Sequence, residues 1–98
     1  EIYGPVTILE TFTTLDEAIQ LANSVDYGLQ AAIFTTNLQT AHFAIQHLEA
    51  GAVIVNDSTD YRIDAMPFGG IKGSGFGREG VRHAVLEMSE PKLACLVL

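Results

Sequence analysis

Apolar and polar positions alternate with two different periods along the first half of the chain, and the change of period predicts strands and helices in turn. PVTILETF at residues 5–12 is rich in β-branched residues with a period near two, which predicts a strand. Residues 29–35 and the apolar AVIVN at 52–56 predict two further, largely buried strands. With a helix expected in each gap, the order is β-α-β-α-β, which predicts right-handed crossovers and a parallel sheet of at least three strands.

Each of the two expected helices has a recognisable start. Thr14 stands three residues before Glu17, which is the spacing of a capping box. Asn37 is a good N-cap for the second helix, and Gly51 is predicted to be the C′ glycine that ends it. The apolar stripe of this second helix consists of Leu38, Ala41, Ile45 and Leu48. We therefore expect both helices to cover the sheet with one apolar face.

The second half of the chain is less regular. About twenty residues after Asn56 show no clear period. Residues 79–87 predict a short helix, and Pro91 interrupts it. KLACLVL at 92–98 predicts an apolar terminal strand. The whole pattern belongs to the α/β class.

The composition is unusually apolar for so short a chain. Of its 98 residues 48% are hydrophobic, and the mean hydropathy is +0.26. A chain of this length buries only about 60–65% of its unfolded surface. Some apolar faces are therefore expected to pack against a partner or against another part of a longer chain.

Charge and cysteine usage exclude several classes of partner. The net charge is −7 and the five Lys and Arg residues are scattered, so we expect no nucleic-acid partner. No apolar run approaches the roughly 20 residues of a membrane span, so no membrane partner is expected. Cys95 is alone, which excludes an internal disulfide and fits a reducing, cytoplasmic setting. It has no basic neighbour in sequence, so we interpret it as a small strand residue and not a nucleophile.

The stretch PFGGIKGSGFGREG at residues 67–80 holds six glycines and a G-x-G-x-x-G at Gly75, Gly77 and Gly80. A dinucleotide-binding turn must follow a strand and begin a long helix, and an acidic residue must follow about 20 positions later. Here loop sequence precedes Gly75, and Pro91 interrupts the segment after Gly80. We therefore predict that these glycines permit positive φ angles and close backbone approach, and do not cradle a phosphate.

No metal site is predicted. His42 and His47 lie five residues apart, which does not place them together on one helix face, and His83 lies in the last expected helix. We interpret all three as surface histidines or histidines with ordinary hydrogen-bond partners.

Four motifs in this order resemble the NAD(P)-dependent aldehyde dehydrogenase superfamily. PFGGIKGSGFGREG is similar to its signature P-F-G-G-x-K-x-S-G-x-G-R-E, and EIYGP is similar to E-I-F-G-P. DYGLQAAIFT and LEAGAVIVN resemble Y-G-L-x-A-x-V-F-T and L-x-x-G-x-V-x-V-N. The resemblance covers nearly the whole chain. It identifies residues 1–88 as the C-terminal part of the catalytic domain and 89–98 as an oligomerisation strand.

The resemblance also implies a chemistry. Enzymes of this family attack an aldehyde with a cysteine thiolate, pass hydride to NAD or NADP and release an acid with a glutamate-activated water. The cysteine, the glutamate, the oxyanion asparagine and the Rossmann domain precede the E-I-F-G-P motif in such enzymes. Because EIYGP opens this chain, we expect a fragment that has no catalytic residue, binds no cofactor by itself and is inactive alone.

Three site residues follow from the motif matches. Glu1 aligns with the glutamate that accepts hydrogen bonds from the nicotinamide ribose. Tyr3 stands where the family usually has a phenylalanine beside the nicotinamide. Phe68 matches an aromatic residue that walls the aldehyde tunnel. Each has an alternative: a frayed terminal residue for the first, and ordinary packing for the other two.

The stretch NDSTDYRIDAM resembles the branch that oxidises lactaldehyde, glyceraldehyde-3-phosphate without phosphorylation, or phosphonoacetaldehyde. We predict that Arg62 faces the substrate and pairs with an anionic tail; the alternative is an ion pair with Asp57, Asp60 or Asp64. Residues 92–98 are predicted to join a neighbouring subunit's sheet, which makes the enzyme a homo-oligomer. The competing hypothesis for the chain is a small α/β oligomerisation or binding module without catalysis.

Overall fold

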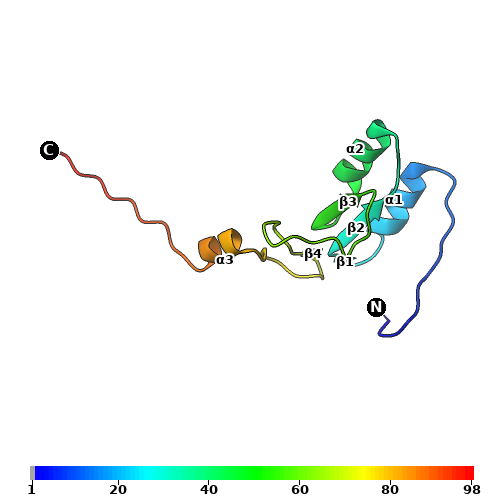
Figure 1. Ribbon diagram of the computed structural model, residues 1–98, viewed down its shortest axis with the longest axis horizontal. Helices are drawn as coiled ribbons and strands as arrows, with labels where there is room; N and C mark the ends of the chain where they lie inside the picture. The colour runs from blue at the N-terminus through cyan, green and yellow to red at the C-terminus, as the bar shows by residue number, and fades with distance from the viewer. Residues whose placement is uncertain (1) are drawn as a thin grey trace.

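The computed structural model describes residues 2–98, which form three helices and four short strands (Figure 1). Glu1 lies outside the described residues. In chain order the elements are α1 (Leu15–Asn23), β1 (Tyr27–Gly28), β2 (Gln30–Ile33), α2 (Leu38–His47), β3 (Ala52–Val55), β4 (Ile71–Lys72) and α3 (Val81–Glu87). None of the helices among residues 2–98 has the length and apolar character that a membrane crossing requires.

Strands β2 and β3 form the parallel pair at the centre of the molecule. Their register runs from Gln30 opposite Ala52 to Ile33 opposite Val55, with α2 as the crossover between them. Parallel strands need such a crossover because the last residue of one strand and the first residue of the next lie at opposite ends of the pair. The α/β class with a parallel element is thereby confirmed.

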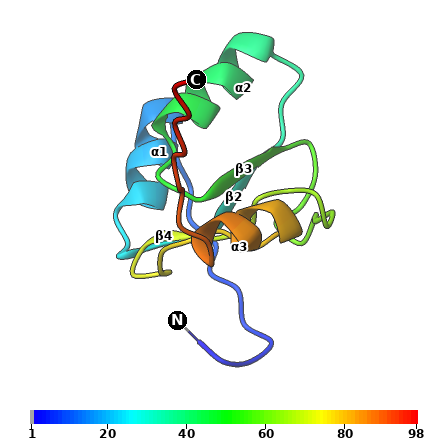
Figure 2. The same cartoon turned by 90° about the vertical axis from the view of Figure 1, so that its left-hand side faces the viewer.

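The small core lies where α1, α2 and β3 meet. Its buried side chains are Ile19 of α1, Ala41 and Ala44 of α2, and Ile54 of β3. The two alanines let the helices approach closely. In Figures 1 and 2, α1 and α2 lie beside the β2–β3 pair, whereas α3 lies apart from it, beyond the loop that contains β4.

The predicted N-caps of the first two helices are confirmed. The Thr14 hydroxyl accepts from the Glu17 N–H at 3.2 Å, and the Glu17 carboxylate accepts from the Thr13 N–H at 2.7 Å. The Asn37 side-chain oxygen accepts from two N–H groups of the first turn of α2. Both arrangements satisfy N–H groups that a helix leaves without a partner.

The prediction that Gly51 ends α2 as a C′ glycine is wrong. The helix ends at His47, and its C-cap Leu48 is already extended. Gly51 lies three residues further on, where a Cβ would collide with the backbone of Gly69. The glycine is needed for close approach between two backbones and not for a left-handed turn.

The strand predicted at residues 5–12 does not form within the described chain. These residues are extended but belong to no ladder, and Leu9 is 89% exposed. A strand needs a neighbour for its N–H and C=O groups, and residues 2–98 bring none to this segment. The sheet therefore has two parallel strands where at least three were expected.

The terminal segment is also unpaired. Residues 92–98 are extended and exposed, and they leave the body of the molecule beyond α3 (Figure 1). The strand predicted there is absent from the described structure, since no partner strand lies alongside.

The total surface confirms that much of the chain lies open. The accessible area is 8265 Å², whereas a compact monomer of 10.6 kDa exposes about 5,500 Å². The radius of gyration is 17.9 Å, compared with about 13 Å for a compact chain of this length. Apolar side chains account for much of this open surface, in agreement with the high hydropathy of the sequence.

Candidate functional site

The glycine-rich stretch is attached to the body of the molecule by the antiparallel pair of β1 and β4. Tyr27 lies opposite Lys72, and Gly28 lies opposite Ile71. The Lys72 ammonium group donates to the Asn23 carbonyl at 2.9 Å and pairs with the Glu49 carboxylate at 2.5 Å. These contacts link the stretch to the C-terminal end of α1 and to the loop after α2.

Beyond β4 the chain reverses direction, so that the end of the glycine-rich stretch lies beside its start. Phe68 and Glu79 form an isolated antiparallel bridge, with N···O distances of 3.1 Å and 2.6 Å. Glycines with positive φ at positions 75, 77 and 80 make the reversal possible. The reversal places residues eleven apart in sequence next to each other.

The interior of this loop is occupied by side chains of the same chain. The Arg78 guanidinium donates to the carbonyls of Gly70 and Gly77 at 3.0 Å and 2.6 Å. The Arg78 backbone N–H donates to the Glu87 carboxylate at 3.0 Å, and that carboxylate also lies beside Gly77. The Arg78 N–H is thus taken by a carboxylate of the same chain, which agrees with the prediction that the loop is not a nucleotide cradle.

Arg62 lies against Phe68 and Glu79. Its guanidinium carbon is 4.3 Å from the centre of the Phe68 ring. One of its terminal nitrogens donates to the Glu79 carboxylate at 2.9 Å. The two charged side chains are 47% and 66% exposed, so solvent reaches both. The alternative interpretation, an ion pair with Asp57, Asp60 or Asp64, does not match the described structure, in which the partner of Arg62 is Glu79.

Phe68 and Glu79 also line a hollow of about 330 Å³ between the glycine loop and α3. Phe76 and Arg78 also line it. A larger hollow of about 460 Å³ lies between the end of α1 and strands β1 and β2, and none of the predicted site residues lines it. The site therefore belongs to the loop and not to the larger hollow.

Tyr3 is not brought to this group of residues. It lies on the N-terminal coil with 94% of its surface exposed. The cofactor prediction for Glu1 falls outside the described residues. Tyr3 and Arg62 therefore come from separate parts of the chain, and nothing within residues 2–98 links them.

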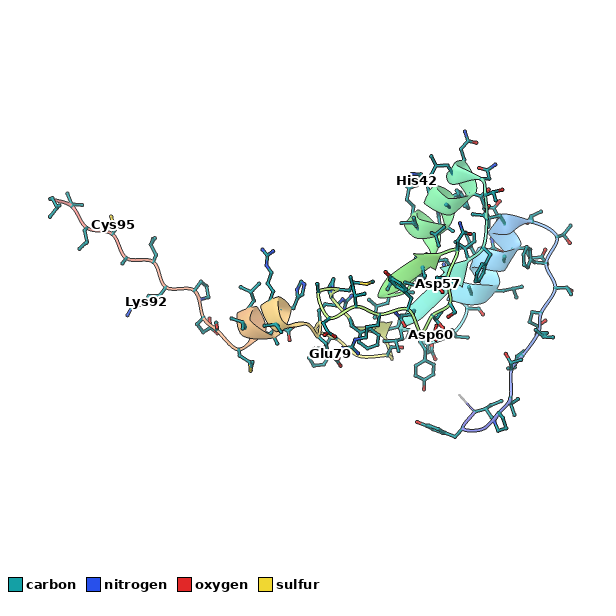
Figure 3. All side chains as sticks on the ribbon, viewed as in Figure 1. His42, Asp57, Asp60, Glu79, Lys92 and Cys95 are labelled. Carbon is teal, nitrogen blue, oxygen red and sulfur yellow. The ribbon has the colours of Figure 1, made fainter. Side chains whose placement is uncertain are left out.

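The remaining candidates are scattered. Figure 3 shows Cys95 far out on the terminal segment, and it is a free, exposed cysteine. The His47 ring is hydrogen-bonded to the Phe43 carbonyl at 2.7 Å, while His42 is exposed on the same helix. Among residues 2–98 no three His, Cys, Asp or Glu side chains gather closely enough to hold a metal ion.

Sequence reasoning missed Glu79. Figure 3 places it on the loop between β4 and α3. Its charge beside Arg78 in the motif GREG was visible, but its pairing with Arg62 depends on the bridge to Phe68. No period or spacing in the sequence encodes that bridge.

The chain belongs to the aldehyde dehydrogenase family, whose model matches residues 1–94. Aspartate-semialdehyde dehydrogenase 1 of Pseudomonas canavaninivorans is 55% identical over 98% of this chain and 20% of its own length. Lactaldehyde dehydrogenase of Methanococcus maripaludis is 46% identical over 94% of this chain and 20% of its own length. The chain thus spans about one-fifth of these relatives.

A solved structure shows the same fold. Glyceraldehyde-3-phosphate dehydrogenase GapN of Methanocaldococcus jannaschii, complexed with NADP, is 50% identical with a TM-score of 0.76. The match covers 80% of this chain and 17% of that protein. The family predicted from the four motifs is confirmed, and its similar members include lactaldehyde and GapN enzymes, as expected.

Proposed function

We propose that these residues form the part of an NAD(P)-dependent aldehyde dehydrogenase that binds the polar tail of a small aldehyde. The observation that carries the proposal is the position of Arg62, which stacks on Phe68 with about half of its side chain exposed. Phe68 was assigned to the tunnel wall by its motif, and Arg62 was assigned to the substrate by its chemistry. The contact between the two supports a shared role.

Arg62 has hydrogen-bonding capacity left for a ligand. Within residues 2–98 its guanidinium makes one hydrogen bond, to Glu79, although it carries five N–H groups. The planar fork suits a carboxylate, phosphate or phosphonate. Phe68 holds the guanidinium flat by cation–π contact and presents an apolar surface that keeps water from the reacting aldehyde.

The cofactor contacts would come from the start of the chain. NAD or NADP, when bound, would supply the hydride acceptor for oxidation of the aldehyde. The exposed face of Tyr3 would lie beside the nicotinamide, and the carboxylate of Glu1 would accept hydrogen bonds from the ribose hydroxyls. Both residues would meet the cofactor only when the rest of a full-length enzyme surrounds them.

Subunit contact is the proposed role of the terminal segment. Residues 92–98 are extended, apolar and open, and Leu93 is 93% exposed. An extended apolar segment of this kind gains hydrogen bonds and apolar burial by adding to a sheet of a second subunit. We propose that the catalytic-domain portion ends at residue 88 and that this segment begins at residue 89. We also propose that the working enzyme is a cytoplasmic homo-oligomer.

The reacting groups come from elsewhere in the enzyme. Cys95 lies on the terminal segment, far from Glu79, the partner of Arg62, so it is not assigned as the nucleophile (Figure 3). The chain covers one-fifth of its relatives' length. The remaining four-fifths would supply the thiolate, the general base and the Rossmann domain. The 98 residues alone are expected to be inactive.

Substitution of Arg62 in the full-length enzyme tests the proposal. Arg62→Leu should lower kcat/KM for anionic aldehydes by roughly 10- to 100-fold, because a hydrogen bond to a charged group contributes about 1.5–3 kcal/mol. Turnover of a neutral aldehyde such as lactaldehyde should change less than about threefold. Arg82→Leu, on the exposed surface of α3, is the matched control. Equal losses for neutral and anionic aldehydes with Arg62→Leu would sink the proposal.

A further inference from the structure

We infer that Asn23, the last residue of α1, is a positioning residue for aldehyde oxidation, because it holds the segment that begins at Phe68 in place. The inference rests on the proposed role of Phe68 as a wall of the aldehyde site and adds a residue that acts on this wall from a distance. Asn23 lies outside the four motifs that resemble the family.

The Asn23 side chain joins the ends of the first two helices. Its amide nitrogen donates to the His47 carbonyl at 2.7 Å, and its amide oxygen accepts from the Glu49 N–H at 2.8 Å. His47 is the last residue of α2, and the last carbonyls of a helix have no donor within the helix. The amide therefore uses both its donor and its acceptor to fix the loop after α2 to the end of α1.

The backbone carbonyl of Asn23 holds the glycine-rich stretch through Lys72. The Lys72 ammonium group donates to this carbonyl at 2.9 Å and to the Val25 carbonyl at 3.4 Å, and it pairs with the Glu49 carboxylate. Three acceptors match the three N–H groups of an ammonium. The negative end of the α1 dipole also favours a cation at this position.

The backbone at Lys72 shows that the attachment is under constraint. Lys72 has a φ of 54°, which is uncommon for a residue with a side chain. Such a conformation persists only where the surroundings impose it. The next residue, Gly73, donates its N–H to the Asp26 carbonyl at 2.7 Å, just beyond the end of α1. Release of the Lys72 side chain would therefore let the backbone of the stretch relax.

A second connection leads from Asn23 to the start of the same segment. Asn23 fixes the Glu49 N–H, and Gly51 follows in the same loop. A Cβ at Gly51 would overlap the Gly69 carbonyl oxygen, so the two backbones are in close contact. Gly69 directly follows Phe68. Segment 68–72 is thus held near its start through Gly51 and at its end through Lys72, which fixes both its position and its direction.

Loss of the Asn23 amide should therefore displace Phe68 without changing any charge. In the full-length enzyme, Asn23→Ala should raise the KM for lactaldehyde and lower kcat/KM about tenfold, since a misplacement of about 1 Å costs up to about 100-fold. The KM for NAD or NADP should stay within about twofold, because Phe68 is assigned to the aldehyde wall and not to the cofactor.

Asn37→Ala is the matched control for a purely structural effect. The Asn37 side chain also makes two hydrogen bonds, accepting from the Gln39 and Thr40 N–H groups at 2.8 Å and 3.1 Å. It lies at the start of α2 and makes no contact with the glycine-rich stretch among these hydrogen bonds. Both variants should lower the urea midpoint, but only Asn23→Ala should raise the aldehyde KM.

Lys72→Met tests the same connection from its other end and covers the case in which Asn23→Ala fails to fold. It removes the ammonium group and keeps most of the side-chain length, so it should also raise the aldehyde KM and leave the cofactor KM unchanged. The double variant should lose little more than either single variant, because both substitutions release one segment.

An aldehyde KM in Asn23→Ala and Lys72→Met no higher than in Asn37→Ala would overturn the inference. Phe68→Ala separates this result from the proposed function. If Phe68→Ala raises the aldehyde KM and the other two variants do not, the wall stands and the positioning role fails. If Phe68→Ala leaves the aldehyde KM unchanged, both fail. Lactaldehyde is neutral, so the outcome is independent of anion binding by Arg62.

Discussion

The contact between Gly51 and the glycine loop leads to a sharp prediction. A Cβ at position 51 would overlap the Gly69 carbonyl oxygen and stand 2.8 Å from the Gly69 carbonyl carbon and 3.0 Å from the Gly70 Cα. All three atoms belong to the backbone, so no change of rotamer relieves the clash. The Gly51 N–H also donates to the Gly28 carbonyl at 3.0 Å, which holds it from the other side.

The expected cost of Gly51→Ala follows from these distances. Ordinary carbon–carbon contacts lie at about 3.5–4.0 Å, and the overlap with the Gly69 carbonyl oxygen is tighter still, so the loop must retreat by more than about 1 Å. Overpacking of this kind costs about 1–3 kcal/mol, and a clash between two backbones belongs at the upper end. Phe68 precedes Gly69 directly, and a shift of about 1 Å in a substrate-positioning residue lowers kcat/KM by up to about 100-fold.

The assay compares Gly51→Ala with Gln46→Ala in the full-length enzyme. Gln46 is exposed on α2 and belongs to none of the proposed site residues, which makes it the control. We expect a loss of about 3 kcal/mol in urea unfolding and a clear loss of aldehyde turnover for Gly51→Ala alone. A stability within about 0.5 kcal/mol of the control, with turnover within twofold, would show that the close approach is not present in the enzyme.

Two further predictions concern the exposed surface. The 98 residues expressed alone should unfold without a cooperative urea transition and should bind the apolar dye ANS, because about 2,800 Å² more surface is open than in a compact monomer of 10.6 kDa; a sharp transition in a monomer would contradict this reasoning. Removal of residues 89–98 from the full-length enzyme should lower the assembly state measured by sedimentation, whereas an unchanged mass would exclude the terminal segment as subunit contact.

Local sequence was sufficient for the helices. Thr14 with Glu17, and Asn37, satisfy N–H groups within the same turn, so the signal and its structural result lie within a few residues. The α/β class followed from periodicity for the same reason. The motifs around EIYGP and PFGGIKGSGFGREG were long enough to identify the family.

Strand formation required information that these residues do not contain. Residues 5–12 and 92–98 have the composition of strands, but a strand forms only when a second segment satisfies its backbone groups. The antiparallel pair of β1 and β4 was not predicted, because each of these strands has only two residues and is too short to show a periodic pattern.

The sequence by itself determined the family and the two capped helices, and it supplied Arg62 and Phe68 as candidate site residues. Only the tertiary structure decided that Glu79 is the partner of Arg62 and that Gly51 faces the glycine loop. The physical reason is the same in both cases. These contacts join segments 17 and 18 residues apart through a chain reversal, and the positions of backbone atoms across such a reversal are not encoded in any local pattern.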